Sequence, residues 1–157
     1  MEIQKVLKAC ILGTGLLWST DVRADEYLLE QVNCLAQNIY FESRNQPKTG
    51  KIAVSQVVMN RVQSPLFPNT PCAVVKQQVW RRGKAVCQFS WFCDGKSDKP
   101  EDGPIWNESV YLALGIYTKS YFDVTEGALW YHATYVSPSW AKTYEQTVRI
   151  NDHIFYK

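Results

Sequence analysis

The chain has 157 residues, of which 46% are hydrophobic and 20% are charged, a composition typical of one globular domain and not of a disordered chain. Its 17 Lys and Arg against 15 Asp and Glu give a net charge of +2, which is no polybasic footprint, so nucleic acid is excluded as the expected partner. Aromatic residues are dense, with six Trp and nine Tyr, and serve either core packing or a stacking surface for sugar rings.

The first 24 residues are expected to be an export signal that is removed. Lys5 and Lys8 form a positive start, and residues 9–18 form a short apolar stretch. The small residues of Val22-Arg23-Ala24 predict cleavage before Asp25. The stretch is too short for a comfortable membrane span, although a signal that inserts first and releases later is an alternative. We therefore expect a protein in the periplasm, in the cell wall or outside the cell, without stable membrane association.

The remaining residues, 25–157, are expected to form a single catalytic domain that acts as a monomer. Cleavage removes Cys10 and leaves an even number of cysteines, which predicts disulfides in an exported chain. Three pairings are possible, and the spacing favours a tight Cys87–Cys93 loop together with a Cys34–Cys72 bridge. A metal site is the weaker alternative because the chain has no C-x-x-C pair.

Residues 26–44 predict an amphipathic helix that carries an acid on its apolar side. At 100° per residue its apolar stripe is formed by Leu28, Val32, Leu35 and Ile39. The next residue on this stripe is Glu42. Partial burial raises the pKa of a carboxyl group, and a protonated carboxyl can donate its proton to a leaving group. The alternative is an acid at a helix end that pairs with Arg44 or Arg61 at the surface.

Two further helices follow in the first half of the chain. The run at about 50–62 is apolar on most sides, so it is expected to be a buried central helix with Thr49 as its N-cap. Thr70 and Pro71 are typical of an N-cap followed by a proline in the first turn, and they predict a short helix through about Val79.

The middle of the chain changes character. Residues 81–103 are expected to form a small lobe or hairpin that a disulfide closes, around the segment CQFSWFC at 87–93. A long helix is expected over about 104–121, opened by a proline. One face of this helix carries Val110, Leu114 and Tyr117, with Ala113 beside them.

The C-terminal part is less helical. Residues 128–135 have the bulk of a strand, and residues 147–156 predict a hairpin, because two short β-rich runs flank a two-residue Asn-Asp turn. The sum is an α+β domain that is predominantly helical, with a small β-hairpin lobe.

The stretch at 34–62, CLAQNIYFESRNQPKTGKIAVSQVVMNRV, resembles the opening of the SleB-type cell-wall hydrolase family. Further blocks follow in the family's order, namely FPNT (67–70), CQFSW and CDG (87–95), GALWYHATYVSPSWA (127–141) and RINDHIFYK (149–157). The resemblance implies a lysozyme-like catalytic domain that cuts the glycan strands of peptidoglycan. It also implies that Glu42 is the catalytic acid and base.

The residues themselves, apart from the resemblance, also indicate how a glycosidic bond could be cleaved. Cleaving the β-1,4 bond between N-acetylmuramic acid and N-acetylglucosamine requires a proton on the glycosidic oxygen, and most glycosidases use two carboxylates for the whole reaction. Only Glu42 has a clear rationale, since Asp94, the second candidate, sits in an Asp-Gly turn. One carboxylate suffices when the sugar's 2-acetamido group stabilises the reacting carbon. Glu42 then takes the proton of the C6 hydroxyl and yields a 1,6-anhydro sugar.

Enzymes similar to this family follow that route, so the resemblance predicts lytic transglycosylase chemistry. A water molecule in place of the C6 hydroxyl would make the protein a muramidase. Neither reaction calls for a cofactor.

Other side chains are candidates for substrate binding. The segment 87–93 is expected to form a wall that binds sugar hydroxyls or acetamide groups and packs an aromatic ring, from Phe89 or Trp91, on a sugar. A histidine and a tyrosine near residue 132 would face the acetamido group or the leaving oxygen. The alternative for each is a structural role, which is the expectation for His153. The full set of candidates is Gln88, Ser90, Trp91, Tyr131, His132, Tyr135 and Trp140.

Two other functions compete with glycan cleavage. A zinc amidase needs a set such as two His and one Glu, and Glu42, His132 and His153 are available, but they are scattered without a compact ligand pair. A wall-binding module that has lost catalysis is the second alternative. The retention of Glu42 on the apolar stripe argues against it.

Overall fold

The computed structural model describes residues 15–157. The chain divides into two units, Met1–Glu30 and Gln31–Lys157; the first helix runs across this boundary, and every later element lies in the second unit. Lys5, Lys8, Cys10 and most of the predicted export signal lie outside the described residues, so cleavage before Asp25 stays a prediction. In residues 15–157 no helix has both the length and the apolar content that a membrane crossing requires.

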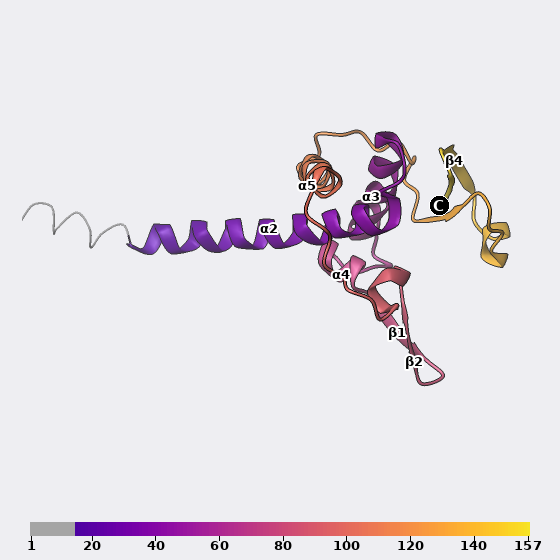
Figure 1. The fold of residues 1–157 in the computed structure, drawn as a ribbon, viewed down its shortest axis with the longest axis horizontal. Helices are drawn as coiled ribbons and strands as arrows, with labels where there is room; N and C mark the ends of the chain where they lie inside the picture. The colour runs from indigo at the N-terminus through magenta and orange to yellow at the C-terminus, as the bar shows by residue number, and fades with distance from the viewer. Residues whose placement is uncertain (1–14) are drawn as a thin grey trace, which may run out of the picture. The chain divides into compact units, whose positions relative to one another are not determined.

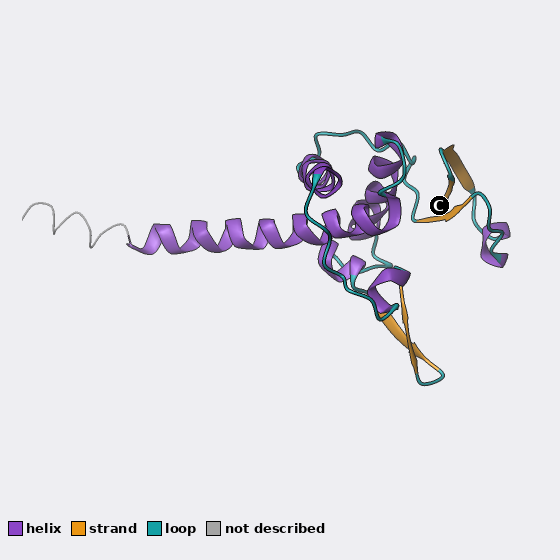
Figure 2. Ribbon diagram, in the orientation of Figure 1, coloured by secondary structure: helices purple, strands orange, loops and turns teal. Residues whose placement is uncertain are grey.

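The described residues form a mainly helical α+β fold, which confirms the predicted class (Figures 1 and 2). The helices are α2 (Gly15–Ser43), α3 (Lys48–Gln63), α4 (Pro71–Val75) and α5 (Pro104–Tyr117), with the short 3₁₀ turns η1 (Ser90–Cys93) and η2 (Ser139–Lys142). The strands are β1 (Gln78–Arg81), β2 (Lys84–Cys87), β3 (Trp130–Ala133), β4 (Gln146–Ile150) and β5 (His153–Tyr156). β1 and β2 form a separate hairpin, while β3, β5 and β4 form an antiparallel sheet in that order.

Helix α3 is the central helix of the Gln31–Lys157 unit, as its apolar sequence predicts. Every residue of Gly50–Val58 is buried, and the helix packs against α4, α5 and β4. Its Ala53 and Val57 join Ala128 and Phe155 in a core cluster that reaches the sheet. The predicted N-cap at Thr49 is wrong, because the helix starts two residues earlier than predicted, at Lys48 after Pro47. Thr49 accepts a hydrogen bond from Asn151 instead (3.2 Å).

The hairpin replaces part of a predicted helix. Thr70 caps α4 as expected, with its hydroxyl accepting from the amide of Ala73 (3.3 Å), but α4 ends at Val75 and not near Val79. The β-rich residues that follow pair with β2 across a turn at Arg82 and Gly83, whose φ angles of 51° and 76° suit a two-residue hairpin. The segment 87–93 therefore runs from the last residue of β2, Cys87, through the 3₁₀ turn η1, and does not itself form the two strands of the hairpin.

The packed face of α5 also differs from the prediction. Helix α5 has apolar residues on several sides, so the contact with α3 decides which face is covered. Val110 and Leu114 are exposed, and α5 ends at Tyr117. The buried residues are Ser109, Leu112, Ala113 and Ile116.

Both favoured disulfide pairings are present in the structure. Cys34–Cys72 joins α2 to the first turn of α4, with a Cα–Cα distance of 5.1 Å. Cys87–Cys93 closes the loop between the hairpin and η1. The first bridge therefore ties the helix that carries Glu42 to the rest of the unit.

Asp123 organises the loop that leads into β3. Its Oδ1 accepts from the amide (2.8 Å) and hydroxyl (2.6 Å) of Thr125, and its Oδ2 accepts from the amide of Gly127 (2.8 Å) and from Asn60 on α3 (3.0 Å). Burial alone would raise the pKa of Asp123, but these hydrogen bonds outweigh it and hold the pKa below its ordinary value. The loop is thus fixed to α3 by a charged acceptor.

We expect Asp123→Asn to lower the free energy of unfolding by about 1 kcal/mol near neutral pH, because hydrogen bonds to the carboxylate are lost while solvent screens this exposed side chain. The folded pKa lies below the unfolded one, so this stabilisation is complete above the unfolded pKa of about 4 and disappears as the pH falls through the folded pKa. Urea unfolding at several pH values checks this. The exposed Asp102→Asn is the control, and a deficit of the Asp123 variant that persists at pH 2 would contradict it.

Candidate active site

Glu42 lies in the last turn of α2, where the apolar stripe of that helix leaves the core. Leu35 and Ile39 on the stripe are fully buried, whereas Glu42 is half-buried. The helix ends at Ser43, whose hydroxyl donates to the carbonyl of Ile39 (2.9 Å). The carboxyl group therefore emerges from the core at a helix end and meets solvent only on one side.

Glu42 is in contact with a tyrosine from the sheet. The hydroxyl of Tyr131 on β3 donates to Oε2 of Glu42 (3.0 Å). The core position of Phe155, whose ring lies 5.7 Å from that of Tyr131, helps to hold the phenol in place. Two elements distant in sequence, the end of α2 and β3, thus meet at this hydrogen bond.

Arg61 of α3 supplies a positive charge behind this pair. Its side chain is only 2% exposed, and its Nε donates to the carbonyl of Leu129 (2.8 Å). Its guanidinium lies over the rings of Phe67 and Phe89, 5.2 and 5.4 Å from their centroids. The side-chain amide of Gln88 lies 3.2 Å from both Nη atoms, so its oxygen accepts from both when it faces Arg61.

These neighbours tune the titration of Glu42. Burial raises the pKa of Glu42, while the hydrogen bond from Tyr131 and the charge of Arg61 act in the opposite direction and only partly offset it. Burial lowers the pKa of Arg61 to about 10, so Arg61 stays charged at neutral pH. Burial also raises the pKa of Tyr131 well above its usual value, so its phenol remains a donor. The Glu42 carboxyl is therefore protonated at higher pH than a solvent-exposed glutamate.

Glu42 lines three neighbouring hollows. The first, of about 260 Å³, also has Tyr135 and His153 in its wall, and the second, of about 520 Å³, has Trp91 and the loop at 94–101. The third, of about 230 Å³, is lined by Gln88, Ser90 and Tyr131 among others. Because all three meet at Glu42, the carboxyl stands at the junction of an open groove and not in a closed pocket. A groove of this kind suits a polymer.

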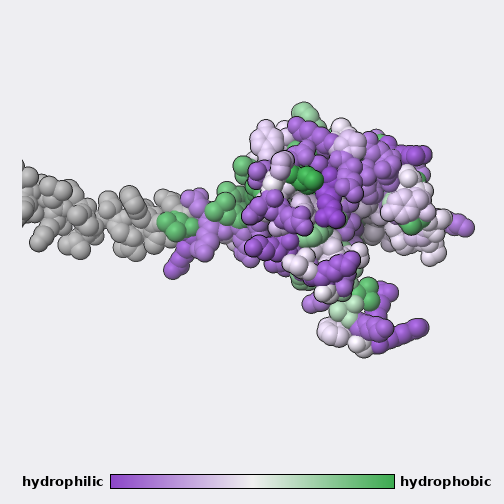
Figure 3. Space-filling model, viewed as in Figure 1, coloured by the Kyte–Doolittle hydropathy of each residue, from purple (hydrophilic) through white to green (hydrophobic). Residues whose placement is uncertain are grey.

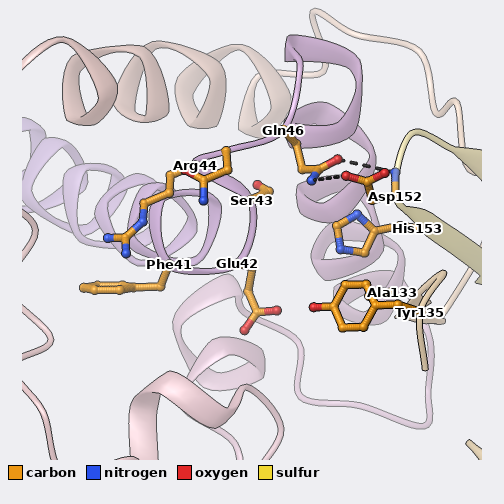
Figure 4. A pocket seen from close by; sticks show the side chains of 10 residues that line it. Phe41, Glu42, Ser43, Arg44, Gln46, Ala133, Tyr135, Asp152 and His153 are labelled. Carbon is orange, nitrogen blue, oxygen red and sulfur yellow. Dashed lines mark hydrogen bonds between the residues drawn. The ribbon is translucent and has the colours of Figure 1, made fainter. Parts of the chain in front are cut away.

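Figure 4 shows the first hollow from close by. Gln46, just after α2, donates through Nε2 to Asp152 Oδ2 (3.1 Å), and the amide of Asp152 donates to Gln46 Oε1 (3.4 Å). These bonds hold the β4–β5 turn beside the end of α2. In this view the phenol of Tyr135 points toward the side where the Glu42 carboxyl lies.

The structure brings five of the predicted binding residues to the hollows around Glu42. Ser90 is exposed and lines two of them, and Trp91 lines the second. Trp91 is itself buried, stacks on Phe41 (ring centroids 4.7 Å apart) and donates to Asn38 (3.3 Å), so it supports the wall more than it offers a free face. The five residues are Gln88, Ser90, Trp91, Tyr131 and Tyr135.

His132 and Trp140 are not brought to Glu42. Side chains alternate along a strand, so Tyr131 and Ala133 face the hollows and His132 faces the other side of the sheet. There its Nδ1 lies 2.9 Å from the carbonyl of Ala133 and its Nε2 lies 2.9 Å from the hydroxyl of Tyr156. Trp140 packs beside it, with 5.5 Å between the ring centroids.

The three residues considered for zinc are not gathered in one place. His153 is buried in the wall of the first hollow with Glu42, whereas His132 points to the opposite face of the sheet. Within residues 15–157, no group of three or more His, Cys, Asp or Glu side chains has the arrangement of a metal site.

Sequence reasoning missed the part that Arg61 and Arg44 have in the site. The sequence suggests Arg61 only as a surface partner of Glu42, and because Arg61 lies in the last turn of α3, where a cation is ordinary, no local pattern marks it for burial. Arg44 lines two of the hollows, with its guanidinium 5.4 Å from the ring centroid of Tyr40. The sequence suggests Arg44 only as a surface partner of Glu42, because the residue follows the end of the periodic stretch and the helical period does not place it in the site.

The chain is similar to known proteins over most of its length. Residues 45–156 match the profile of the family described as Cell Wall Hydrolase. The chain belongs to this cell wall hydrolase family. The predicted resemblance to SleB-type members is confirmed by two solved structures, the SleB catalytic domains of Bacillus cereus and Bacillus anthracis. Each is 30% identical to this chain, covers 81% of it and superposes with a TM-score of 0.61 or 0.62; the chain covers 89% and 93% of them.

Curated relatives show a similar level of identity. Spore cortex-lytic enzymes of Bacillus subtilis and Bacillus cereus are each 32% identical, over 79% and 83% of this chain. The chain spans 36% and 46% of the length of these relatives. The family match begins three residues after Glu42, so the role of Glu42 is argued from the geometry.

Proposed function

We propose that this chain is a peptidoglycan hydrolase that cleaves the β-1,4 bond between N-acetylmuramic acid and N-acetylglucosamine as a lytic transglycosylase. The observation that carries the proposal is Glu42, a carboxyl with a raised pKa at the junction of the groove, held by Tyr131. The relatives that are spore cortex-lytic enzymes, and a structural neighbour described as a germination-specific lytic transglycosylase, support it.

In the first step, protonated Glu42 donates its proton to the glycosidic oxygen, and the bond from C1 of the muramic acid to that oxygen breaks. The 2-acetamido group of the sugar stabilises the electron-poor C1. The carboxylate that remains on Glu42 is stabilised by the hydrogen bond from Tyr131 and by the charge of Arg61. The neighbours that oppose a high pKa therefore act where negative charge develops.

In the second step, the Glu42 carboxylate takes the proton of the C6 hydroxyl while that oxygen bonds to C1. The product is a 1,6-anhydro sugar, and Glu42 is protonated again. Water in place of the C6 hydroxyl gives a muramidase, which is the alternative outcome at the same site.

A single carboxylate is consistent with the position of Asp94. Asp94 lines the second hollow with Glu42, but its Oδ1 accepts from the amide of Lys96 (2.9 Å) and its Oδ2 lies 3.8 Å from the Lys96 ammonium. These contacts are typical of a turn residue. We therefore assign Asp94 no role in the chemistry.

Products released from purified sacculi test the proposal. Mass spectrometry should detect anhydro-muropeptides, which are lighter than the hydrolysed form by one water molecule. Reducing ends without anhydro sugars would indicate a muramidase. Release of free amino groups, lost with EDTA and restored by zinc, would favour the amidase, and binding without any product would favour the non-catalytic module.

We expect Tyr131→Phe to raise the pKa of Glu42 further, because the hydrogen bond from Tyr131 favours the charged carboxylate. The alkaline limb of the pH profile of kcat/KM, where Glu42 loses its proton, should then move to higher pH. The maximal kcat/KM should fall about tenfold or more, since a hydrogen bond to a charged group is removed. Turbidity loss of sacculi between pH 4 and 9 provides the profile.

Tyr156→Phe is the matched control, because its hydroxyl lies near His132 on the other face of the sheet. Its alkaline limb should stay where it is in the wild type. An unmoved limb in Tyr131→Phe would remove Tyr131 from the site.

A further inference from the structure

A fourth hollow, of about 510 Å³, lies beside the β1–β2 hairpin. Val79, Arg81 and Val86 of the hairpin and Trp140 of η2 contribute to its wall. Gln88 lines both this hollow and the third hollow at Glu42. The fourth hollow therefore adjoins the groove at Glu42 across Cys87 and Gln88, and its wall includes Trp140, a predicted sugar-binding residue that the structure keeps away from Glu42.

One face of the hairpin has an apolar part and a cationic part. The register pairs Val79 with Val86 and Arg81 with Lys84, and paired residues in an antiparallel ladder project to the same side. In the described part of the chain no salt bridge includes Arg81 or Lys84. Figure 3 shows hydrophobic atoms next to strongly hydrophilic ones on this projecting hairpin.

The charges on and beside the hairpin are positive. Lys76, Arg81, Arg82 and Lys84 are all exposed, and residues 76–92 contain no Asp or Glu. Both valines of the hairpin face are exposed, as are the two cations. A surface of this kind attracts a ligand that carries carboxylates next to apolar groups.

We propose that this hollow is a distal subsite for a muramic acid unit that bears its peptide. Trp140 would pack on the sugar ring, the two valines would contact the lactyl and first peptide methyl groups, and Arg81 would pair with a peptide carboxylate. The proposal rests on the proposed function, since the same strand must reach Glu42. It implies that the protein prefers glycan strands with peptides over bare strands.

Two substitutions that remove the same charge distinguish a direct contact of Arg81 with the ligand from a general effect of positive charge near the hairpin. Arg81 lines the hollow, whereas Arg82 lies in the turn and does not. We expect wild type to cleave peptide-bearing strands with a kcat/KM about fivefold above that for strands stripped of peptides by an amidase, as suits an exposed charge pair. Arg81→Gln should bring this ratio close to one, and Arg82→Gln should leave it unchanged. The same ratio is expected for binding by the Glu42→Gln protein.

Several outcomes would overturn the subsite. They are the absence of any preference in wild type, an equal loss in the Arg81 and Arg82 variants, and Arg81-dependent binding to phosphatidylglycerol vesicles without a preference among strands. The last would assign the hairpin to a membrane surface. The proposed function is tested independently of the subsite, because unchanged cleavage by the Glu42→Gln protein would contradict the proposed function alone.

Discussion

Glu42→Gln is expected to lower the rate of glycan cleavage by at least about 10³-fold, within the range for loss of a general acid. Gln has the volume of Glu and can still accept the hydrogen bond from Tyr131, but it has no proton to give and no charge with which to take one. One carboxyl is proposed for both steps, so both fail together. Anhydro-muropeptides released per hour from sacculi measure the loss.

The variant should bind glycan as wild type does, since Gln keeps the shape of Glu and the other residues that line the groove are unchanged. Asp94→Asn is the control carboxylate in the same groove, with an expected fall in rate of no more than about threefold, as for a surface position. A wild-type cleavage rate in Glu42→Gln would contradict the assignment of Glu42 as the catalytic acid and base. A large fall in the cleavage rate of Asp94→Asn would indicate that the reaction uses two carboxylates.

The position of Glu42 is predictable from sequence for a definite reason. A helix repeats every 3.6 residues, so the buried residues Val32, Leu35 and Ile39 define a side, and the same period places Glu42 at its end. This prediction does not depend on which elements pack against the helix. The β4–β5 hairpin is equally local, because its Asn-Asp turn fixes the pairing of its two strands.

Features that depend on a distant partner were not predictable in the same way. α5 is apolar on several sides, so only its contact with α3 selects the face with Leu112 and Ile116. Arg61 is tied to the carbonyl of Leu129, 68 residues away, and no local pattern announces that bond. The separation of Tyr131 from His132, in contrast, follows from strand alternation and could have been derived once β3 was expected.

Removing the Cys34–Cys72 bridge by a double Ser substitution is expected to lower the free energy of unfolding by about 4 kcal/mol. The bridge spans 38 residues, and loop entropy in the unfolded chain predicts a value of that order. For a domain of this size the melting temperature should fall by roughly 10–15 °C. Calorimetry under oxidising conditions measures it. A wild type treated with a reductant should approach the same value, in keeping with the predicted export.

The matched variant removes Cys87–Cys93, whose loop closes over a separation of only six residues. The same argument gives a smaller loss of stability, about 2 kcal/mol. Its loop carries Gln88 and Ser90, both in the groove at Glu42. The main effect of this variant should therefore be a higher KM for glycan, with only a small fall in the free energy of unfolding. The two variants should therefore have different effects. Loss of Cys34–Cys72 should lower stability, and loss of Cys87–Cys93 should weaken binding of the glycan strand by the wall of the groove. Equal effects of both variants on stability and on KM would contradict this division.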